Sequence, residues 1–300
     1  MGAILAMMAA ATSTCTLPPG WDAVAARKTP YVIFGEYHGT EEAPAFVGNV
    51  VCALARRKQR VLVALEITSG EDPDLQAAWR RPAGAFADAA VATIVDWSAD
   101  RGGGPMSSAT LAMLDRLHRL KTRGAKIDVV AFNGVRDDAQ RAKFADLGDV
   151  GGHEAAQAEN IRLAAERGRY DKVIVLVGNY HARKKPIVRG GITYEPMAMR
   201  LAPPAQVTSL DLAYGDGTAF SCQMREGFTP VAGKPVTKAD VDCRPRPLRG
   251  MPLPAGPARI ALAETPWTRE PALFDGYYWV GPIRAAGVAA PVPAKDNASQ

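Results

Sequence analysis

Two Gly-x-x-His segments carry the residues of this sequence that are best placed to do chemistry. One is Gly35–His38 (Gly-Glu-Tyr-His), and the other is Gly178–His181 (Gly-Asn-Tyr-His). Each directly follows an apolar run typical of a buried strand, Tyr31–Phe34 and Val173–Val177. Two of only four histidines therefore stand at strand ends, where open α/β sheets gather their functional groups.

Carboxylates accompany these histidines. Glu36 stands two residues before His38, and Glu66 ends the apolar run Val61–Leu65, where a carboxylate is costly to bury unless it is paired. Such a set favours either of two chemistries. A divalent metal held by His38, His181 and one or both of Glu36 and Glu66 would activate water, or a histidine tuned by a carboxylate would act as general base without a metal. These ligands suit manganese, cobalt, zinc or iron and do not choose among them.

The order of strands and helices predicts the sheet that positions these residues. Strand-like and helix-like stretches alternate from residue 31 to residue 212, which is typical of an α/β fold with a mostly parallel central sheet flanked by helices. Thr218–Met224 is expected to form a C-terminal hairpin with the preceding strand across Tyr214–Gly217, and Tyr277–Val280 is expected to return as an edge strand. The expected strands are Tyr31–Phe34, Val61–Leu65, Ile127–Phe132, Val173–Val177 and Val207–Leu212, and the expected helices are Pro44–Arg57, Leu75–Trp97, Ser108–Thr122 and His153–Arg167.

Composition fits one folded domain. The hydrophobic content of 47% and the charged content of 22% exclude disordered and fibrous classes. A net charge of +5 without interleaved basic and aromatic residues predicts no nucleic-acid partner. We expect a signal segment at 1–20, a single α/β domain at 21–284 with a Pro-rich insertion at 222–257, and a disordered tail at 285–300.

The N-terminal segment and the cysteines favour export. Residues 1–11 are almost wholly apolar, as in a secretory signal peptide, although no basic segment precedes them; the alternative is a frayed, Ala-rich end. The expected location is the periplasm, the medium, or the outer membrane through a lipid on Cys15. A bridge between Cys222 and Cys243 would close a loop of about 20 residues and contribute roughly 3 kcal/mol, whereas Cys52 is expected to be a buried thiol.

The paired motifs resemble a known superfamily. Gly35–Thr40, Glu66 and Gly178–Ala182 are similar to the pattern of the Tiki/TraB, erythromycin-esterase and ChaN-like superfamily, which is described by two Gly-x-x-His motifs with a Glu between them. The resemblance covers roughly residues 31–201 and implies an α/β fold with its site at the strand ends. It also implies a choice of function, because Tiki-type members are metal-dependent proteases, erythromycin esterases activate water with the first-motif histidine, and ChaN-like lipoproteins bind haem in iron uptake.

The resemblance also assigns roles to single residues. It places catalysis on His38, Glu36, Glu66 and His181. One departure concerns a helix that reads Arg-Asp-x-x-Met-Ala-x-Asn in these families and His153–Asn160 here, so that His153 replaces the arginine. The residues expected to bind substrate are Asn179, His153, Tyr37 and Tyr180, and the two tyrosines are also candidate ligands of haem iron.

These observations predict an exported bacterial hydrolase that cleaves an ester or amide bond in a small molecule or peptide. His38 or a bound divalent metal would activate the water. The alternative is a non-catalytic ChaN-like protein that binds haem or metal in iron uptake, and a third possibility is an inactive member kept as an interaction module. The basic run Arg183–Lys185, just past His181, is either a solvated loop or a means of capturing an anionic substrate.

Overall fold

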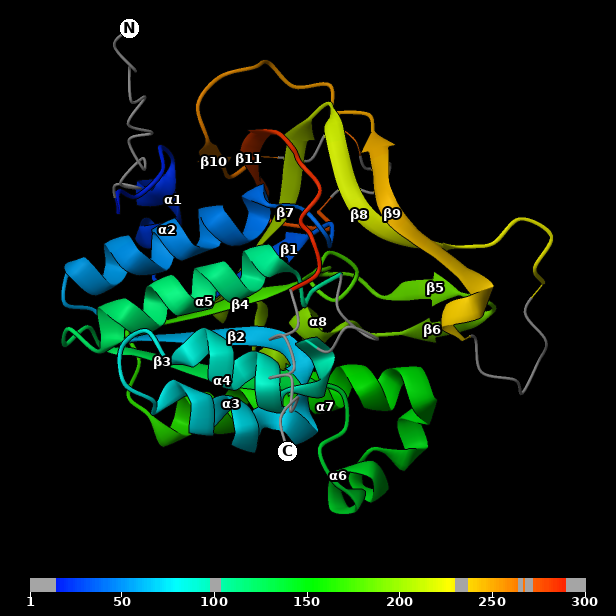
Figure 1. The fold of residues 1–300 in the computed structure, drawn as a ribbon, viewed down its shortest axis with the longest axis horizontal. Coiled ribbons are helices and arrows are strands. Elements are labelled where there is room, and N and C mark those ends of the chain that lie inside the picture. The colour runs from blue at the N-terminus through cyan, green and yellow to red at the C-terminus, as the bar shows by residue number, and fades with distance from the viewer. Residues whose placement is uncertain (1–14, 98–103, 230–236, 264–266, 268–271, 290–300) are drawn as a thin grey trace, which may run out of the picture.

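Strands and helices alternate along the chain, as the sequence pattern predicts. The computed structural model describes residues 15–97, 104–229, 237–263, 267 and 272–289 (Figure 1). The strands are β1 (Tyr31–Glu36), β2 (Val61–Thr68), β3 (Ile127–Asn133), β4 (Lys172–Gly178), β5 (Ile187–Arg189), β6 (Ile192–Tyr194), β7 (Val207–Gly215), β8 (Gly217–Met224), β9 (Val241–Leu248), β10 (Arg259–Ala261) and β11 (Gly276–Pro282). The α-helices are α1 (Trp21–Ala26), α2 (Glu42–Arg56), α3 (Asp72–Trp79), α4 (Phe86–Thr93), α5 (Ser108–Lys121), α6 (Asp138–Lys143), α7 (Gly148–Arg167) and α8 (Met197–Leu201).

A seven-stranded sheet forms the centre of the molecule, in the order β10-β11-β7-β1-β4-β2-β3. Neighbouring strands are parallel except β10, which runs antiparallel to β11. The predicted α/β fold with a mostly parallel sheet is therefore confirmed. Strands β1, β4 and β2 lie side by side in the middle, so the loops that leave their carboxyl ends share one edge of the sheet.

Both faces of the sheet are covered, which explains the continuous apolar runs in the sequence. Alternate residues of β2 point to opposite faces. Val63 and Leu65 belong to the core that includes α2 and α5, whereas Leu62 and Ala64 belong to the core that includes α7 and α8. Figure 1 shows α2 and α5 together on one side of the sheet.

The predicted hairpin between β7 and β8 is wrong. β8 pairs instead with β9, from Gly217 opposite Leu248 to Met224 opposite Val241. β7 is not free to pair with β8 because β1 and β11 already flank it. The segment described from the sequence as a Pro-rich insertion therefore supplies a strand of a separate two-stranded arm, which Figure 1 shows beyond the sheet.

Two other expectations about elements need correction. The helical region expected at Leu75–Trp97 is divided into α3 and α4, because Pro82 and Gly84 lie between them and Gly84 has a φ of 84°. The return strand expected at Tyr277–Val280 is present as β11, but β10 lies outside it and forms the edge.

The first and last described residues contact the rest of the domain, through a disulfide at one end and through buried side chains at the other. Cys15 is bonded to Cys52, so the expectation of a free thiol at Cys52 is wrong, and the folded part includes residues 15–20 of the expected signal segment. Ala286 and Ala289 are buried, so the expected tail is ordered at least as far as residue 289, while 1–14 and 290–300 lie outside the described residues. Within the part of the chain described, no helix has the length and apolar character needed to cross a membrane.

Candidate active site

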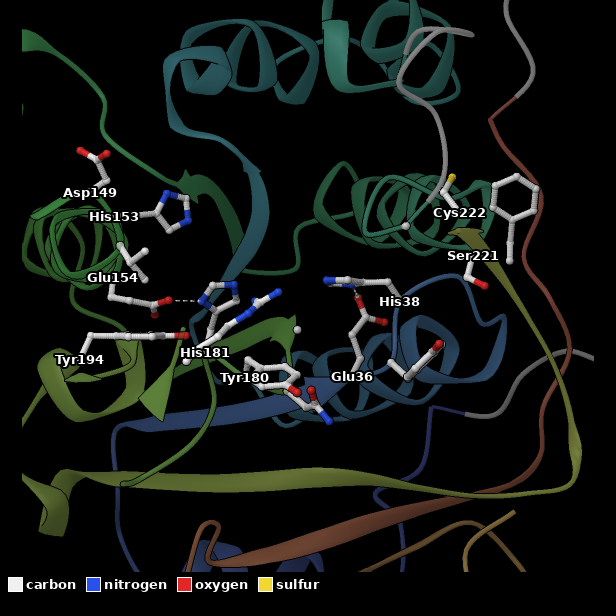
Figure 2. Close-up of a pocket in the computed structure, with 17 residues that line it drawn as sticks. Glu36, His38, Asp149, His153, Glu154, Tyr180, His181, Tyr194, Ser221 and Cys222 are labelled. Atoms are coloured by element: carbon white, nitrogen blue, oxygen red, sulfur yellow. Dashed lines mark hydrogen bonds and ion pairs between the residues drawn. The ribbon is translucent and has the colours of Figure 1, made fainter. Parts of the chain in front are cut away.

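The first motif ends β1, and its glutamate and histidine contact each other. Glu36 is the last residue of β1 and is 4% exposed, and the side chain of His38, two residues further on, is 29% exposed. The Glu36 Oε1 atom lies 3.0 Å from Nδ1 of His38 (Figure 2). Because an ionised carboxylate only accepts, this contact holds the proton on Nδ1 and leaves Nε2 as the nitrogen that exchanges a proton.

Glu66, on the strand next to β4, lies between the two motif histidines. Its Oε2 atom accepts a hydrogen bond of 2.7 Å from the backbone N–H of Gly178. The same Oε2 atom is 3.5 Å from Nε2 of His38, and Oε1 is 3.7 Å from Nε2 of His181. Both oxygens of Glu66 therefore have polar partners, which offsets the cost of burying a carboxylate at the end of an apolar run.

The second-motif histidine is held by a residue that the sequence analysis did not single out. Glu154 of α7 is 3% exposed, and its Oε1 atom lies 2.7 Å from Nδ1 of His181 (Figure 2). Its other oxygen accepts a 2.7 Å hydrogen bond from the backbone N–H of Met197. The available signal was the helical spacing of Glu154, Gln157 and Ile161, which places a carboxylate on the buried face of α7.

Carboxylates and imidazoles alternate across the site, in the spatial order Glu36, His38, Glu66, His181, Glu154. Burial lowers the pKa of His38, but the charge of Glu66 and the contact with Glu36 outweigh burial and raise this pKa to about 9. Burial also opposes protonation of His181, while the bond to Glu154 and the charge of Glu66 raise the pKa of His181. Both imidazoles therefore hold a second proton more tightly than an ordinary histidine does.

His153 differs from the two motif histidines. Burial lowers its pKa, and the charge of His181 lowers it further against the opposing effect of Glu154. Its ring centre lies 5.9 Å from that of His181, and its Nε2 atom lies 3.0 Å from the amide nitrogen of Gln157. His153 therefore brings a third imidazole into the site, and it is the one that favours the neutral form.

Asn179 is held in place by a second residue that the sequence analysis missed. Its side chain is hydrogen-bonded to Asp211 of β7, which is 3% exposed and also accepts a 2.9 Å hydrogen bond from the indole of Trp267. Burial raises the pKa of Asp211 to about 6, against the effect of these hydrogen bonds. The signal for Asp211 was the one that identified Glu66, a carboxylate within an apolar strand.

A cleft of about 820 Å³ opens over these residues, and Glu36, His38 and His181 line it. The exposed fractions of Tyr37 and Tyr180 are 39% and 50%, so their rings are available to a ligand. Phe220, Ser221 and Cys222 of β8 also line the cleft, so the arm formed by β8 and β9 is part of the candidate site. The four residues expected to bind substrate all line the cleft: Asn179, His153, Tyr37 and Tyr180.

The four residues expected to ligate a metal do not meet as a ligand set. Among the described residues, no group of three or more His, Cys, Asp or Glu side chains is arranged to hold a metal ion. Glu36 contacts Nδ1 of His38 and Glu66 faces Nε2, so the two carboxylates lie at opposite edges of one imidazole ring. An ion at Nε2 of His38 would meet Glu66 and not Glu36. The expected metal site made of His38, His181, Glu36 and Glu66 stays a prediction, with Glu66 as the carboxylate that lies near both imidazoles.

Comparison with known proteins identifies the fold. No family model matches the chain, and no curated protein matches its sequence. Among solved structures, a mutant of the erythromycin esterase EreC in its open conformation matches with a TM-score of 0.62 at 13% identity, over 90% of this chain and 95% of that chain. This chain has the fold of an erythromycin esterase.

Two further structures share this erythromycin-esterase fold. A succinoglycan biosynthesis protein matches with a TM-score of 0.58 at 11% identity, over 91% of this chain and 94% of that chain. A protein from Bacillus cereus matches with a TM-score of 0.55 at 12% identity, over 92% and 95% of the two chains. The fold expected from the paired motifs is thus confirmed, while identities this low establish the fold alone.

Proposed function

We propose that this protein is a hydrolase that cleaves an ester or amide bond and that His38, paired with Glu66, activates the attacking water. The observation that carries the proposal is the placement of His38 between two carboxylates, with Glu36 at Nδ1 and Glu66 3.5 Å from Nε2. A carboxylate that fixes one nitrogen of a histidine lining a cleft is the arrangement of a histidine general base.

The proposed step moves one proton through His38. The water oxygen forms a bond to the carbonyl carbon, and a water proton passes to Nε2 of neutral His38. The imidazolium, stabilised by Glu36 and Glu66, then gives this proton to the leaving oxygen or nitrogen as the bond to that atom breaks. Asn179 and His153, which line the same cleft, are proposed to hydrogen-bond the carbonyl oxygen as its negative charge develops.

The size of the cleft supports a small substrate. Small-molecule sites range over roughly 300–1,000 Å³, and the cleft of about 820 Å³ lies within this range. We therefore propose a small ester or amide ahead of a peptide.

Export is also part of the proposal. Two disulfides, Cys15–Cys52 and Cys222–Cys243, are typical of proteins from oxidising compartments such as the periplasm or the medium. Lipid attachment through Cys15 is not proposed, because its sulfur is bonded to Cys52.

The haem-binding alternative has less support from the site. Glu36 and Glu154 contact Nδ1 of His38 and His181, and Glu66 lies 3.5 Å and 3.7 Å from their Nε2 atoms. Haem iron would have to displace Glu66 from Nε2 to bind there, whereas proton transfer from water to Nε2 leaves Glu66 in place. Tyr37 and Tyr180 remain as candidate iron ligands. A Soret band that appears on haem titration and weakens when either tyrosine is changed to Phe would favour this alternative over the hydrolase.

The proposed hydrolase is tested by screening the purified protein against naphthyl and nitrophenyl esters and anilides. We expect His38→Gln and Glu66→Gln to lower kcat by about 10²- to 10⁴-fold, the usual contribution of general acid–base catalysis. Glu166→Gln, an exposed carboxylate on α7, is the matched control and should keep full activity. Full activity in folded His38→Gln protein would refute the assignment.

A further inference from the structure

A second cavity of about 350 Å³ adjoins the catalytic cleft. Tyr180, Arg183 and Arg189 line it together with residues 186–188. Tyr180 and Arg189 line the catalytic cleft as well, so the two hollows share a wall. Groups bound in the cleft and groups bound in this second cavity would therefore contact the same two residues.

Arg183 presents an unsatisfied donor beside this shared wall. Its guanidinium carbon lies 4.3 Å from the centre of the Tyr180 ring. Its Nε atom is buried and has no hydrogen-bond partner among the described residues. A buried N–H without an acceptor is costly, and such an atom in a native structure calls for an explanation, of which a bound water or ion is one. Asp211 feels the charge of Arg183, but its own hydrogen bonds go to Trp267 and Asn179.

Of the basic residues near this cavity, Lys184 is paired with a carboxylate, whereas Arg183 and Arg189 are not paired with any carboxylate that the structure describes. Lys184 lies 2.8 Å from both carboxylate oxygens of Asp275, so its charge is neutralised within the fold. Arg189 is exposed and, like Arg183, makes no ion pair with a carboxylate in the described part of the chain. Glu195, close by in sequence, pairs with Arg200. Arg183 and Arg189 thus place two guanidinium groups at one cavity, and neither forms an ion pair within the described residues.

We infer that Arg183 and Arg189 bind an oxyanion, a carboxylate or a phosphate, carried by the part of the substrate that is not cleaved. The planar guanidinium fork matches the oxygens of both anions. This inference rests on the proposed hydrolase and narrows its substrate class. The aromatic residues Tyr180, Tyr194 and Phe220 line the cleft, and the Tyr180 ring also contacts the Arg183 guanidinium. The substrate is therefore an amphipathic ester or amide with an apolar body and an anion remote from the scissile bond.

The test uses probes that cannot be hydrolysed, so that binding is measured apart from catalysis. Naphthoxyacetate, the phosphonate of equal length and the neutral primary amide are titrated by naphthalene fluorescence. We expect the wild-type protein to bind at least one anion about tenfold more tightly than the amide, as charged hydrogen bonds at a partly exposed site allow. Arg183→Gln and Arg189→Gln should each remove most of this preference, and Arg183→Lys should keep part of it.

Arg169→Gln is the matched control, because Arg169 is an exposed arginine that lines neither cavity. It should bind all three probes as the wild type does, and thermal melts should show that every variant is folded. Equal affinity of the wild type for anions and amide, or a preference that survives in the Arg183→Gln/Arg189→Gln double variant, would overturn the inference. If the arginine variants lose the preference for anions but the wild-type protein cleaves no ester, the anion site is upheld and the proposed hydrolase is rejected.

Discussion

Gly178 and His38 lie so close together that a Cβ at position 178 would come within 2.8 Å of Nε2 of His38. The relationship is reciprocal, because a Cβ at Gly35 would lie 2.9 Å from the Cβ of Ala182 and 3.1 Å from the Cα of Asn179. The glycine of each motif therefore leaves room for the other motif, since β1 and β4 are neighbours in the sheet. This close approach explains why both motifs begin with glycine.

Gly178→Ala should abolish activity while the domain stays folded. The added methyl group displaces the His38 ring, and the backbone N–H that anchors Glu66 belongs to the same residue. We expect kcat to fall by about 10²-fold or more, as for loss of the general base. Gly70→Ala is the control, because a Cβ at Gly70 meets no atom within 4 Å. Equal activity of the two variants, measured with an ester substrate, would contradict this account of the motif.

The pKa of His38 determines the expected pH dependence. A general base must be neutral, and the pKa of about 9 keeps most of His38 protonated at neutral pH. We therefore expect kcat/KM to rise with pH until about 9. Glu36→Gln removes one cause of the raised pKa and should move this rise to lower pH. A profile that falls above pH 7 would instead assign His38 the role of an acid.

The same pKa makes a separate prediction for stability. Because the folded-state pKa of His38 is raised above 6.5, its contribution to stability is fully present below about pH 6.5. It is lost as the pH rises through about 9, so the free energy of unfolding should decrease over this interval. His38→Gln should flatten that decrease in denaturant titrations at several pH values. An unchanged slope in the variant would show that other groups cause it.

The central strands, and the positions of the two motif histidines and of Glu36 and Glu66 near their carboxyl ends, were predictable because they depend on local pattern. Continuous apolar runs mark strands covered on both faces, and polar residues that end them, such as Glu36 and Glu66, stand out. Glu154 was missed because it reaches His181 from a helix 27 residues earlier in the chain, a relation set by packing rather than by spacing. The pairing of β8 with β9 also depends on packing, since it follows from both sides of β7 being occupied.

Glu154 should prove as important to the second histidine as Glu36 is to the first. Glu154→Gln removes the charge that helps to raise the pKa of His181 and weakens the bond that orients its ring. We expect kcat/KM to fall by about 10- to 100-fold, the range known for residues that orient metal-ligating histidines through the same kind of hydrogen bond. An NMR titration should also show a lower pKa for His181 in the variant. Glu166→Gln, on the same helix, should change neither quantity.

Chelation separates the side-chain mechanism from a metal-dependent one. Glu36 and Glu66 lie at opposite edges of the His38 ring, which does not suit a shared ion. We expect dialysis against a chelator to leave kcat unchanged. Loss of activity on dialysis, followed by recovery on addition of zinc, manganese, cobalt or iron, would show that the residues rearrange around a metal and would reject the metal-free mechanism.

The two disulfides should differ in their effect on substrate binding. Cys222 lines the cleft and is bonded to Cys243 across the arm formed by β8 and β9, whereas Cys15–Cys52 ties the start of the described chain to α2. Their sequence separations of 21 and 37 correspond to about 3 and about 4 kcal/mol of stabilisation in the chain-entropy description.

Replacing Cys222 and Cys243 by serine should therefore raise KM more than it lowers kcat, because the arm forms a wall of the cleft while the two motif histidines follow β1 and β4 of the main sheet. Replacing Cys15 and Cys52 should lower Tm without changing KM, because neither residue lines the cleft. Kinetics and melts on both double variants check the contrast. Equal KM values in the two would mean that the arm formed by β8 and β9 does not contact the substrate.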